Sequence, residues 1–152
     1  MDTMTKEQRH TVMSHIRSSD TKPELAIRSA LHSFGFRFRK NLNGLLGKPD
    51  MVFPKYRAVV FVNGCFWHAH DCGRFRLPKS NVEFWRGKFE RNKERDRRIA
   101  DSLIADGWRV CVLWECAMSA SSRKERAERV KSAAERISLW LEEEISVQFL
   151  EI

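Results

Sequence analysis

The stretch from residue 58 to residue 72 reads Ala58-Val59-Val60-Phe61-Val62-Asn63-Gly64-Cys65-Phe66-Trp67-His68-Ala69-His70-Asp71-Cys72. Its first five residues are a continuous apolar run, which is typical of a strand that is buried on both faces. The residues that follow gather cysteine, histidine and aromatic side chains in one short segment. We therefore expect a buried strand that delivers a chemically rich loop to the edge of a sheet.

Helix and strand patterns alternate on both sides of this stretch. Apolar periodicity, capping residues and glycine stops predict helices over residues 5–17, 21–34, 80–106 and 123–144. Period-two alternation and apolar runs predict strands over residues 36–39, 49–53 and 108–114, in addition to 58–62. We expect an α/β fold with a mixed β-sheet flanked by helices. The expected organisation is one domain over residues 1–152, with an N-terminal helix over about 1–18 and a C-terminal helix and tail over about 122–152.

Composition limits the class of protein. The chain has 152 residues, a net charge of +8 and a hydrophobic fraction of 42%, which is too apolar for a disordered protein. Its longest stretch without Asp, Glu, Lys or Arg, residues 58–70, has thirteen residues, whereas a membrane-spanning helix needs about 20 apolar residues, so we expect no such helix. The N-terminal residues contain no apolar signal core, and we expect the protein in the cytoplasm. The basic surplus favours a nucleic acid as partner, although net charge alone also fits a membrane surface or an acidic protein.

A basic helix is predicted to contain residues 86–98. Its composition suits contacts with phosphates, and Lys88 or Asn92 could reach the edges of bases. A solvated helix with ion pairs between neighbouring turns explains the same composition equally well.

Cysteine and histidine spacing suggests a metal site. Cys65, His70 and Cys72 could supply local zinc ligands, and Cys116 could complete a tetrahedral set. His68 is either a ligand in place of His70 or a catalytic base beside the metal. Cys111 lies within an apolar strand, so it is expected in the core. The alternative is that the cysteines are ordinary small core residues.

Two further features carry possible chemistry. Asp50 follows a proline at the start of a strand and could present a carboxylate to Mg²⁺ at a sheet edge. The Pro-Asp dipeptide by itself favours an ordinary turn aspartate. Phe66, Trp67 and Trp85 have polar or basic neighbours, and such aromatic residues can stack on bases or wedge between them.

Taken together, these segments resemble one known family. The shared residues are Lys48-Pro49-Asp50, Asn63 through Cys72, Glu83-Phe84-Trp85, Asn92 through Arg98, Gly107 through Val110 and Trp114-Glu115-Cys116. In order and approximate spacing they resemble the very-short-patch repair (Vsr) DNA mismatch endonucleases. The resemblance implies a fold similar to type II restriction endonucleases, with a structural zinc site.

The resemblance also implies an activity. It is a Mg²⁺-dependent nick in one strand of double-stranded DNA at a T·G mismatch, which arises where 5-methylcytosine has deaminated, and it initiates very short patch repair. The implied enzyme is DNA-associated and monomeric, and mismatch-repair proteins are a partner class that the family suggests. The alternatives are a restriction-type endonuclease that cuts matched DNA and a non-catalytic, zinc-containing DNA-binding protein.

The resemblance assigns a role to each candidate residue. Asp50 and the main-chain carbonyl of Val62 would bind Mg²⁺, His68 would be the base, and Glu24 and Asp96 would hold metal-bound waters or the histidine. The implied zinc ligands are Cys65, His70, Cys72 and Cys116. The implied wedge is Phe66, Trp67 and Trp85, while Met13, Lys88 and Asn92 would contribute to mismatch recognition and the N-terminal helix would clamp the DNA.

Two positions depart from the family pattern. Val62 and Asn63 stand where the family often has threonine and histidine. A carbonyl ligand survives the first change because the side chain is not the donor. The second change removes either a phosphate contact or an accessory acid, so the resemblance assigns no residue to the protonation of the leaving group.

Overall fold

The structure is a computed structural model that describes residues 4–14, 20–73, 75–143 and 147–152, apart from the side chain of Met13. Three sequence-based expectations fall outside these residues. They are the role of Met13 in mismatch recognition, the end of the first helix at Arg17 and the end of the last helix at Glu144.

The described residues form a five-stranded sheet and four α-helices. The strands β1 (Arg39–Lys40), β2 (Met51–Phe53), β3 (Ala58–Asn63), β4 (Arg109–Trp114) and β5 (Phe149–Glu151) follow one another in the sheet in chain order. The helices are α1 (Lys6–Ser14), α2 (Lys22–Ser33), α3 (Val82–Ala105) and α4 (Arg123–Glu142), with short 3₁₀ turns at Pro54–Tyr56 and Glu115–Met118. This arrangement confirms the expected mixed sheet flanked by helices.

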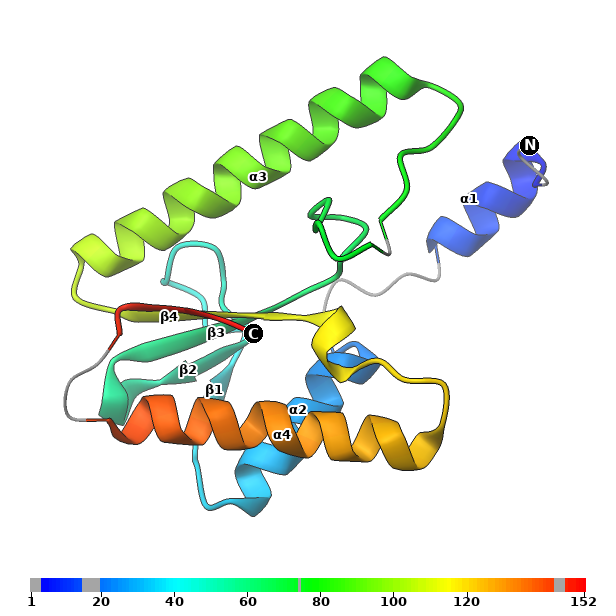
Figure 1. Ribbon diagram of the computed structural model, residues 1–152. Coiled ribbons are helices and arrows are strands. Elements are labelled where there is room, and N and C mark those ends of the chain that lie inside the picture. Colours follow the sequence, from blue (N-terminus) through cyan, green and yellow to red (C-terminus); the bar gives the residue numbers. More distant parts are fainter. Residues whose placement is uncertain (1–3, 15–19, 74, 144–146) are drawn as a thin grey trace.

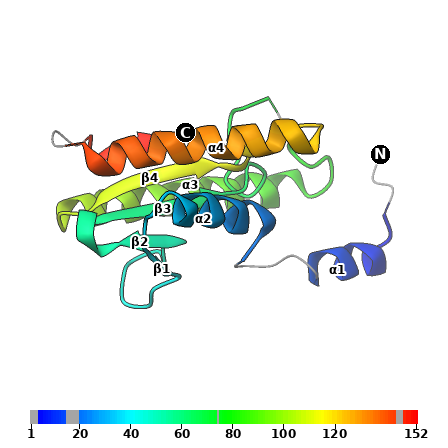
Figure 2. The ribbon, with the colours of Figure 1, turned by 90° about the horizontal axis from the view of Figure 1, so that it is seen from below.

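Helices cover both faces of the sheet. Figure 1 shows α3 on one face and α2 and α4 on the other, and Figure 2 shows the same layering from below. The core under α2 and α4 contains Ile27, Val60 and Ile137, while the core under α3 contains Val59, Leu103 and Val110. Neighbouring strand residues such as Val59 and Val60 enter opposite cores because side chains alternate along a strand. None of the described helices combines the length and the apolar character that crossing a membrane requires.

The direction of the strands determines where the loops meet. β1, β2 and β3 pair antiparallel, whereas β3, β4 and β5 pair parallel. Parallel neighbours need a crossover connection, and α3 and α4 provide these two crossovers on opposite faces (Figure 1). The carboxyl ends of β3 and β4 therefore lie side by side, with Asn63 opposite Trp114. The Cys/His loop begins at this edge.

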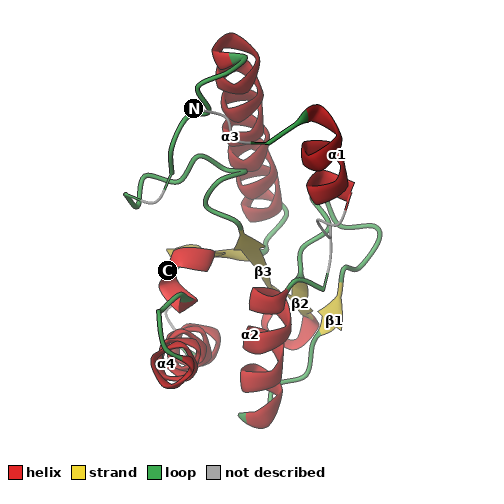
Figure 3. Ribbon diagram, turned by 90° about the vertical axis from the view of Figure 1, so that its right-hand side faces the viewer, coloured by secondary structure: helices red, strands yellow, loops and turns green. Residues whose placement is uncertain are grey.

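The N-terminal helix lies apart from these layers. In Figures 1 and 3, α1 stands beside the start of α3, away from α2 and the sheet. Its residue Val12 is about half exposed, as expected for a helix with few apolar residues. The capping box is present, since the backbone N–H of Gln8 donates to Thr5 Oγ1 and the N–H of Thr5 donates to Gln8 Oε1.

The structure corrects three local predictions. The strand expected over residues 36–39 is observed only at Arg39–Lys40, and the register places residues 36 and 37 beyond the end of β2 at Phe53, where Pro54 starts a 3₁₀ turn and offers no N–H. Helix α3 begins without a side-chain cap, since Asn81 takes a left-handed conformation with φ +52°. The expected C-terminal tail contains strand β5, which extends the parallel part of the sheet.

Candidate active site

Two charged clusters meet the carboxyl end of β3. One contains acids from α2 and from the start of β2, and the other joins the loop at residues 64–73 to α3. Asp50 links them, because the charges of Glu24 and His68 both act on its carboxyl group. The sequence-predicted residues Asp50, His68 and Glu24 therefore belong to one site.

Asp50 is held against the backbone of β3. Its Oδ2 accepts a hydrogen bond of 2.6 Å from the N–H of Val62. Burial is the main cause that raises the pKa of Asp50, to about 6, and the charge of Glu24 raises it further. The Val62 bond, Arg28 and His68 oppose this shift. The site thus contains a carboxyl group that gains from a nearby cation.

Glu24 is the second acid of this cluster and is 4% exposed. Its position in the first turn of α2 follows from the N-terminal cap, in which Thr21 accepts from the N–H of Glu24. Glu24 Oε2 accepts from the N–H of Asp20 at 2.9 Å and lies 3.3 Å from Arg28 Nη2. Arg28 was not among the residues predicted from the sequence. It lies four residues after Glu24, which is the spacing of an ion pair on one face of a helix.

His68 is bound by α3. Its Nδ1 is hydrogen-bonded to Asp96 Oδ2, and both side chains are partly exposed. When Nδ1 carries the proton that is shared with a carboxylate, the lone pair lies on Nε2. Asp96 therefore orients the ring and leaves Nε2 to act as a base. The two residues are 28 positions apart in the chain, so only the fold brings them together.

The four expected zinc ligands come together. One ligand atom from each of Cys65, His70, Cys72 and Cys116 lies within 4.8 Å of the others. Cys116 Sγ is 3.5 Å from His70 Nδ1, a separation suited to two ligands of one tetrahedral ion. Mainly because of burial, the pKa of the Cys65 thiol rises to about 12, so a cation is needed to hold it as a thiolate.

The two histidines of the loop at residues 64–73, His68 and His70, contact different partners. The backbone bonds from His68 N–H to Gly64 and from His70 N–H to Cys65 fold the segment into tight turns. Ala69, between them, has a left-handed φ of +46°. His70 stacks on Trp114 with ring centroids 3.8 Å apart and planes 2° apart, whereas His68 faces Asp96. The indole of Trp114 is thus the surface against which the His70 ring packs.

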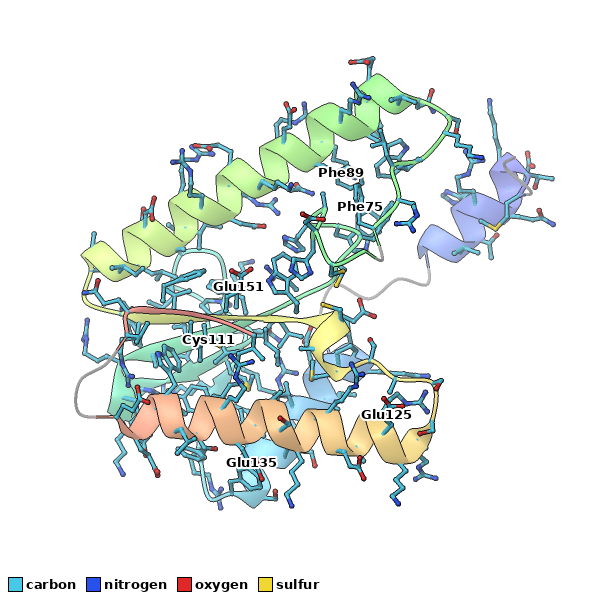
Figure 4. All side chains as sticks on the ribbon, in the orientation of Figure 1. Phe75, Phe89, Cys111, Glu125, Glu135 and Glu151 are labelled. Atoms are coloured by element: carbon cyan, nitrogen blue, oxygen red, sulfur yellow. The ribbon has the colours of Figure 1, made fainter. Side chains whose placement is uncertain are left out.

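Aromatic residues form a cluster between this loop and the start of α3. Phe66 contacts Trp67, Trp85 and Phe89 with ring centroids 5.1, 5.8 and 5.4 Å away. Figure 4 shows Phe75 and Phe89 beneath α3 on the side facing the loop. Phe66 and Phe84 remain 37% and 57% exposed. The three predicted wedge residues, Phe66, Trp67 and Trp85, therefore share one partly exposed surface.

Lys88 and Asn92 lie on α3 next to this cluster. Lys88 Nζ is 5.4 Å from the ring of Trp67 and 5.3 Å from that of Trp85, within the range of a cation–π interaction. Asn92 Nδ2 donates to the main-chain carbonyl of Trp67 at 2.9 Å. Each of the two residues therefore contacts the loop that carries the aromatic side chains.

The basic helix forms fewer internal ion pairs than the sequence suggested. Among the described residues of 86–98, Glu94 pairs with Arg97 at 2.9 Å, and Asp96 lies 4.0 Å from Arg95. Most basic side chains of this segment therefore enter no ion pair with a described residue, which leaves α3 suited to contacts with phosphates.

A pocket of about 480 Å³ lies between α3 and the strands β4 and β5. Its walls include His68, Asp96, Trp114 and Glu151, together with Asn63. Glu151 was not singled out in the sequence, and its Oε1 accepts from Trp114 Nε1 at 2.6 Å. The C-terminal strand thus contacts the residue that supports His70.

Comparisons with known proteins place these residues in context. The family model described as DNA mismatch endonuclease Vsr matches residues 1–74. The chain is 49% identical over 118 residues to the type II nicking enzyme V.XorIIP of Xanthomonas oryzae pv. oryzae, covering 78% of this chain and 87% of that protein. It is 39% identical over 140 residues to the DNA mismatch endonuclease Vsr of Escherichia coli, covering 92% and 87%. The type II nicking enzyme V.NmeAIP of Neisseria meningitidis is 46% identical over 115 residues, covering 76% and 82%.

Proposed function

Because the chain belongs to the Vsr family of DNA mismatch endonucleases, we propose that it nicks one strand of double-stranded DNA at a T·G mismatch. The lesion is the product of 5-methylcytosine deamination, and the nick initiates very short patch repair. The reaction is hydrolysis of a phosphodiester and depends on Mg²⁺. We also propose that the protein acts as a monomer on DNA in the cytoplasm.

The observation that carries this proposal is that Asp50 is bonded to the end of β3 and lies near enough to His68, the partner of Asp96, for the charge of His68 to act on its carboxyl group. Phosphodiester hydrolysis needs a base for the attacking water and positive charge near the phosphate oxygens. Asp50 and Glu24 form an acidic cluster of oxygen donors, which is the chemistry that Mg²⁺ prefers. These residues therefore fit the divalent ion that the family implies.

The backbone of β3 supplies a second oxygen. In an extended strand, the N–H and C=O of one residue point to the same side, so the Val62 carbonyl faces the side on which its N–H binds Asp50. Continuing the β2–β3 register places Pro49 opposite Val62, and proline has no N–H to donate to that carbonyl. Asp50 and the Val62 carbonyl would hold Mg²⁺, which when bound neutralises charge on the phosphate.

His68 is the proposed general base. Nε2 takes a proton from the attacking water, while the bond from Nδ1 to Asp96 keeps the ring oriented and stabilises the imidazolium that forms. Glu24 is buried beside Asp50 and orients water through its carboxylate. Asn63 has no acidic proton to give, so water is the proposed donor to the leaving oxygen.

The cluster of Cys65, His70, Cys72 and Cys116 would hold a structural zinc ion. Three ligands lie in the loop and the fourth follows β4, so the closed site ties the loop to the sheet. His68 lies between the ligands Cys65 and His70 in the sequence, so fixing these two residues would also hold His68 at hydrogen-bonding distance from Asp96.

The aromatic cluster is the proposed mismatch reader. Phe66, Trp67 and Trp85 would enter the base stack, at a cost that is smallest where pairing is already weak. Lys88 and Asn92 would contribute contacts to the mismatched pair, and the basic face of α3 would hold phosphates. The N-terminal helix α1 would close on the DNA from the side on which Figures 1 and 2 show it.

A cleavage assay with both strands labelled tests this function. We expect one nick in one strand of a T·G duplex with Mg²⁺, and no cut in the matched duplex. The variants D50N and H68N should lose at least about 100-fold in rate. The exposed residues Asp106 and His32 provide the matched controls D106N and H32N, which should keep full activity.

Two outcomes would contradict the proposal. Equal cutting of both strands in matched DNA would indicate a restriction-type endonuclease. Tight binding to T·G duplexes without Mg²⁺-dependent cleavage would indicate a non-catalytic DNA-binding protein.

A further inference from the structure

A buried arginine lies between the acids of the candidate metal site. Arg28 on α2 is 5% exposed. Its Nη1 is 2.6 Å from Asp20 Oδ1, and its Nη2 is 3.0 Å from the main-chain carbonyl of Asp50 and 3.3 Å from Glu24 Oε2. One guanidinium group therefore connects α2 with the start of β2, over 22 positions of the chain.

Only the planar fork of an arginine makes this set of contacts. The two terminal nitrogens point in fixed directions, so the distance between Glu24 and the Asp50 backbone is set by one rigid group. A lysine brings the same charge but a single nitrogen, which cannot reach all three partners in this way. The side chain therefore determines geometry as well as charge.

Fold stability alone does not account for this residue. Arg28 Nε is buried and makes no hydrogen bond to any residue that the structure describes. A buried charge with an unsatisfied N–H is costly, and an apolar side chain of similar volume would fill the same space without that cost. Glu24 and Asp50, by contrast, are neighbouring acids whose charges repel each other, and the guanidinium contacts the carboxylate of the first and the main-chain carbonyl of the second.

We propose that Arg28 is a positioning residue that holds the Asp50 backbone and the Glu24 carboxylate in the arrangement that a divalent cation requires. This inference rests on the proposed function. Arg28 itself touches neither the ion nor the DNA. Its loss lets the two acids move apart, so the cation must organise them when it binds, and the affinity for the cation falls.

Binding of Mn²⁺ to the full-length protein, followed by electron paramagnetic resonance, tests the inference without cleavage. We expect R28M to bind Mn²⁺ at least about tenfold more weakly than the wild type and to need correspondingly more Mg²⁺ for half-maximal nicking. Saturating Mg²⁺ should restore most of the rate. Affinity for a T·G duplex without divalent ions should stay unchanged.

Arg109 provides a matched control. Its guanidinium also makes three hydrogen bonds, to the main-chain carbonyls of Trp140, Tyr56 and Leu141, away from the acids. R109M should lower the melting temperature and leave the Mn²⁺ affinity unchanged. If R28M unfolds, R28K carries the test, because it keeps the charge and loses the fork, and we expect it to show the same weaker binding.

Unchanged Mn²⁺ affinity in the folded Arg28 variants would overturn the inference, and so would an equal loss in R109M. These results differ from a failure of the proposed function. In that case the wild-type protein itself would show no Mg²⁺-dependent nicking, or D50N would bind Mn²⁺ as well as the wild type.

Discussion

At the scale of single residues, Asp50 lies in surroundings that oppose the charge its proposed role requires. Burial and the neighbouring Glu24 disfavour the carboxylate, and the pKa of Asp50 rises to about 6 as a result. Metal-binding acids show this conflict because a cation resolves it when it binds. Without the cation, the ionised group lowers the stability of the folded protein.

We therefore expect D50N to stabilise the fold in a pH-dependent way. The folded wild-type protein retains a proton that the unfolded chain loses, so its stability falls as the pH rises from about 4 to about 6. Because D50N has no carboxyl group at this position, its stability does not fall in this way. The free energy of unfolding of D50N relative to that of the wild type should therefore increase by about 2–3 kcal/mol between pH 4 and pH 6. Urea unfolding at pH 4 and pH 8, without Mg²⁺, measures the difference.

The control for this prediction is D106N, which changes an exposed aspartate at the end of α3. Its stability should follow the wild type at both pH values. A constant difference between D50N and the wild type over the same pH range would contradict the assigned burial effect.

At the scale of elements, β5 connects the C-terminus to the candidate zinc site. The strand pairs with β4, and the N–H of Trp114 donates to the carbonyl of Ile152 at 2.9 Å. Glu151 accepts from the indole of the same tryptophan, and His70 stacks on that indole. Two side-chain contacts in series, Glu151 to Trp114 and Trp114 to His70, thus connect the last strand to a proposed metal ligand.

We predict that E151A loosens this chain while E151Q preserves it. Glutamine keeps an oxygen acceptor for the Trp114 indole, whereas alanine removes it at a cost of about 0.5–1.5 kcal/mol in stability. Zinc should leave E151A several-fold faster than E151Q when a chromophoric chelator is added. Equal release rates for the two variants would show that β5 does not support the zinc site.

At the scale of the whole molecule, the parallel pairing of β3 and β4 decides which distant residues meet. Both strands end at the same edge, so the loop at residues 64–73 and the 3₁₀ turn at Glu115–Met118 become neighbours. Cys116 then reaches His70 across 46 positions of the chain. Cys111, five residues earlier, faces the core between the sheet and α4 (Figure 4) and is fully buried.

This contrast predicts opposite behaviour for two cysteine variants. The purified protein should contain about one zinc ion per chain, C116S should lose it, and C111A should keep it. Zinc in 1,000-fold excess over its dissociation constant contributes about 4 kcal/mol to stability, so C116S should melt at a lower temperature in a zinc-dependent way. Metal analysis together with thermal unfolding checks both, and a zinc-free, fully folded wild type would contradict the assignment.

Local patterns were sufficient for most helices and strands. Capping at Thr21 and periodicity through Leu31 predicted α2, and apolar runs predicted β3 and β4. These signals act over a few residues, so no knowledge of the fold is needed to interpret them. The strand expected over residues 36–39 is not formed at residues 36 and 37, because the register places them beyond Phe53, where the partner strand β2 ends. Strand β5 was missed for the same reason, since three residues acquire strand structure only beside β4.

For the candidate site, too, some features could be predicted from the sequence and others depended on the tertiary structure. The types of residue, their short spacing and the family resemblance were enough to propose acids for Mg²⁺, thiols for zinc and an aromatic wedge. The residues alone left the roles of His68 and His70 open and gave no reason to choose Arg28. The tertiary structure places His68 against Asp96 and His70 against Cys116, and it buries Arg28 between Glu24 and Asp50. Such assignments depend on contacts between distant segments. The two histidines acquire their partners only after the crossover of α3 brings β3 and β4 together, and Arg28 acquires its bond to Asp50 only when α2 packs beside the start of β2.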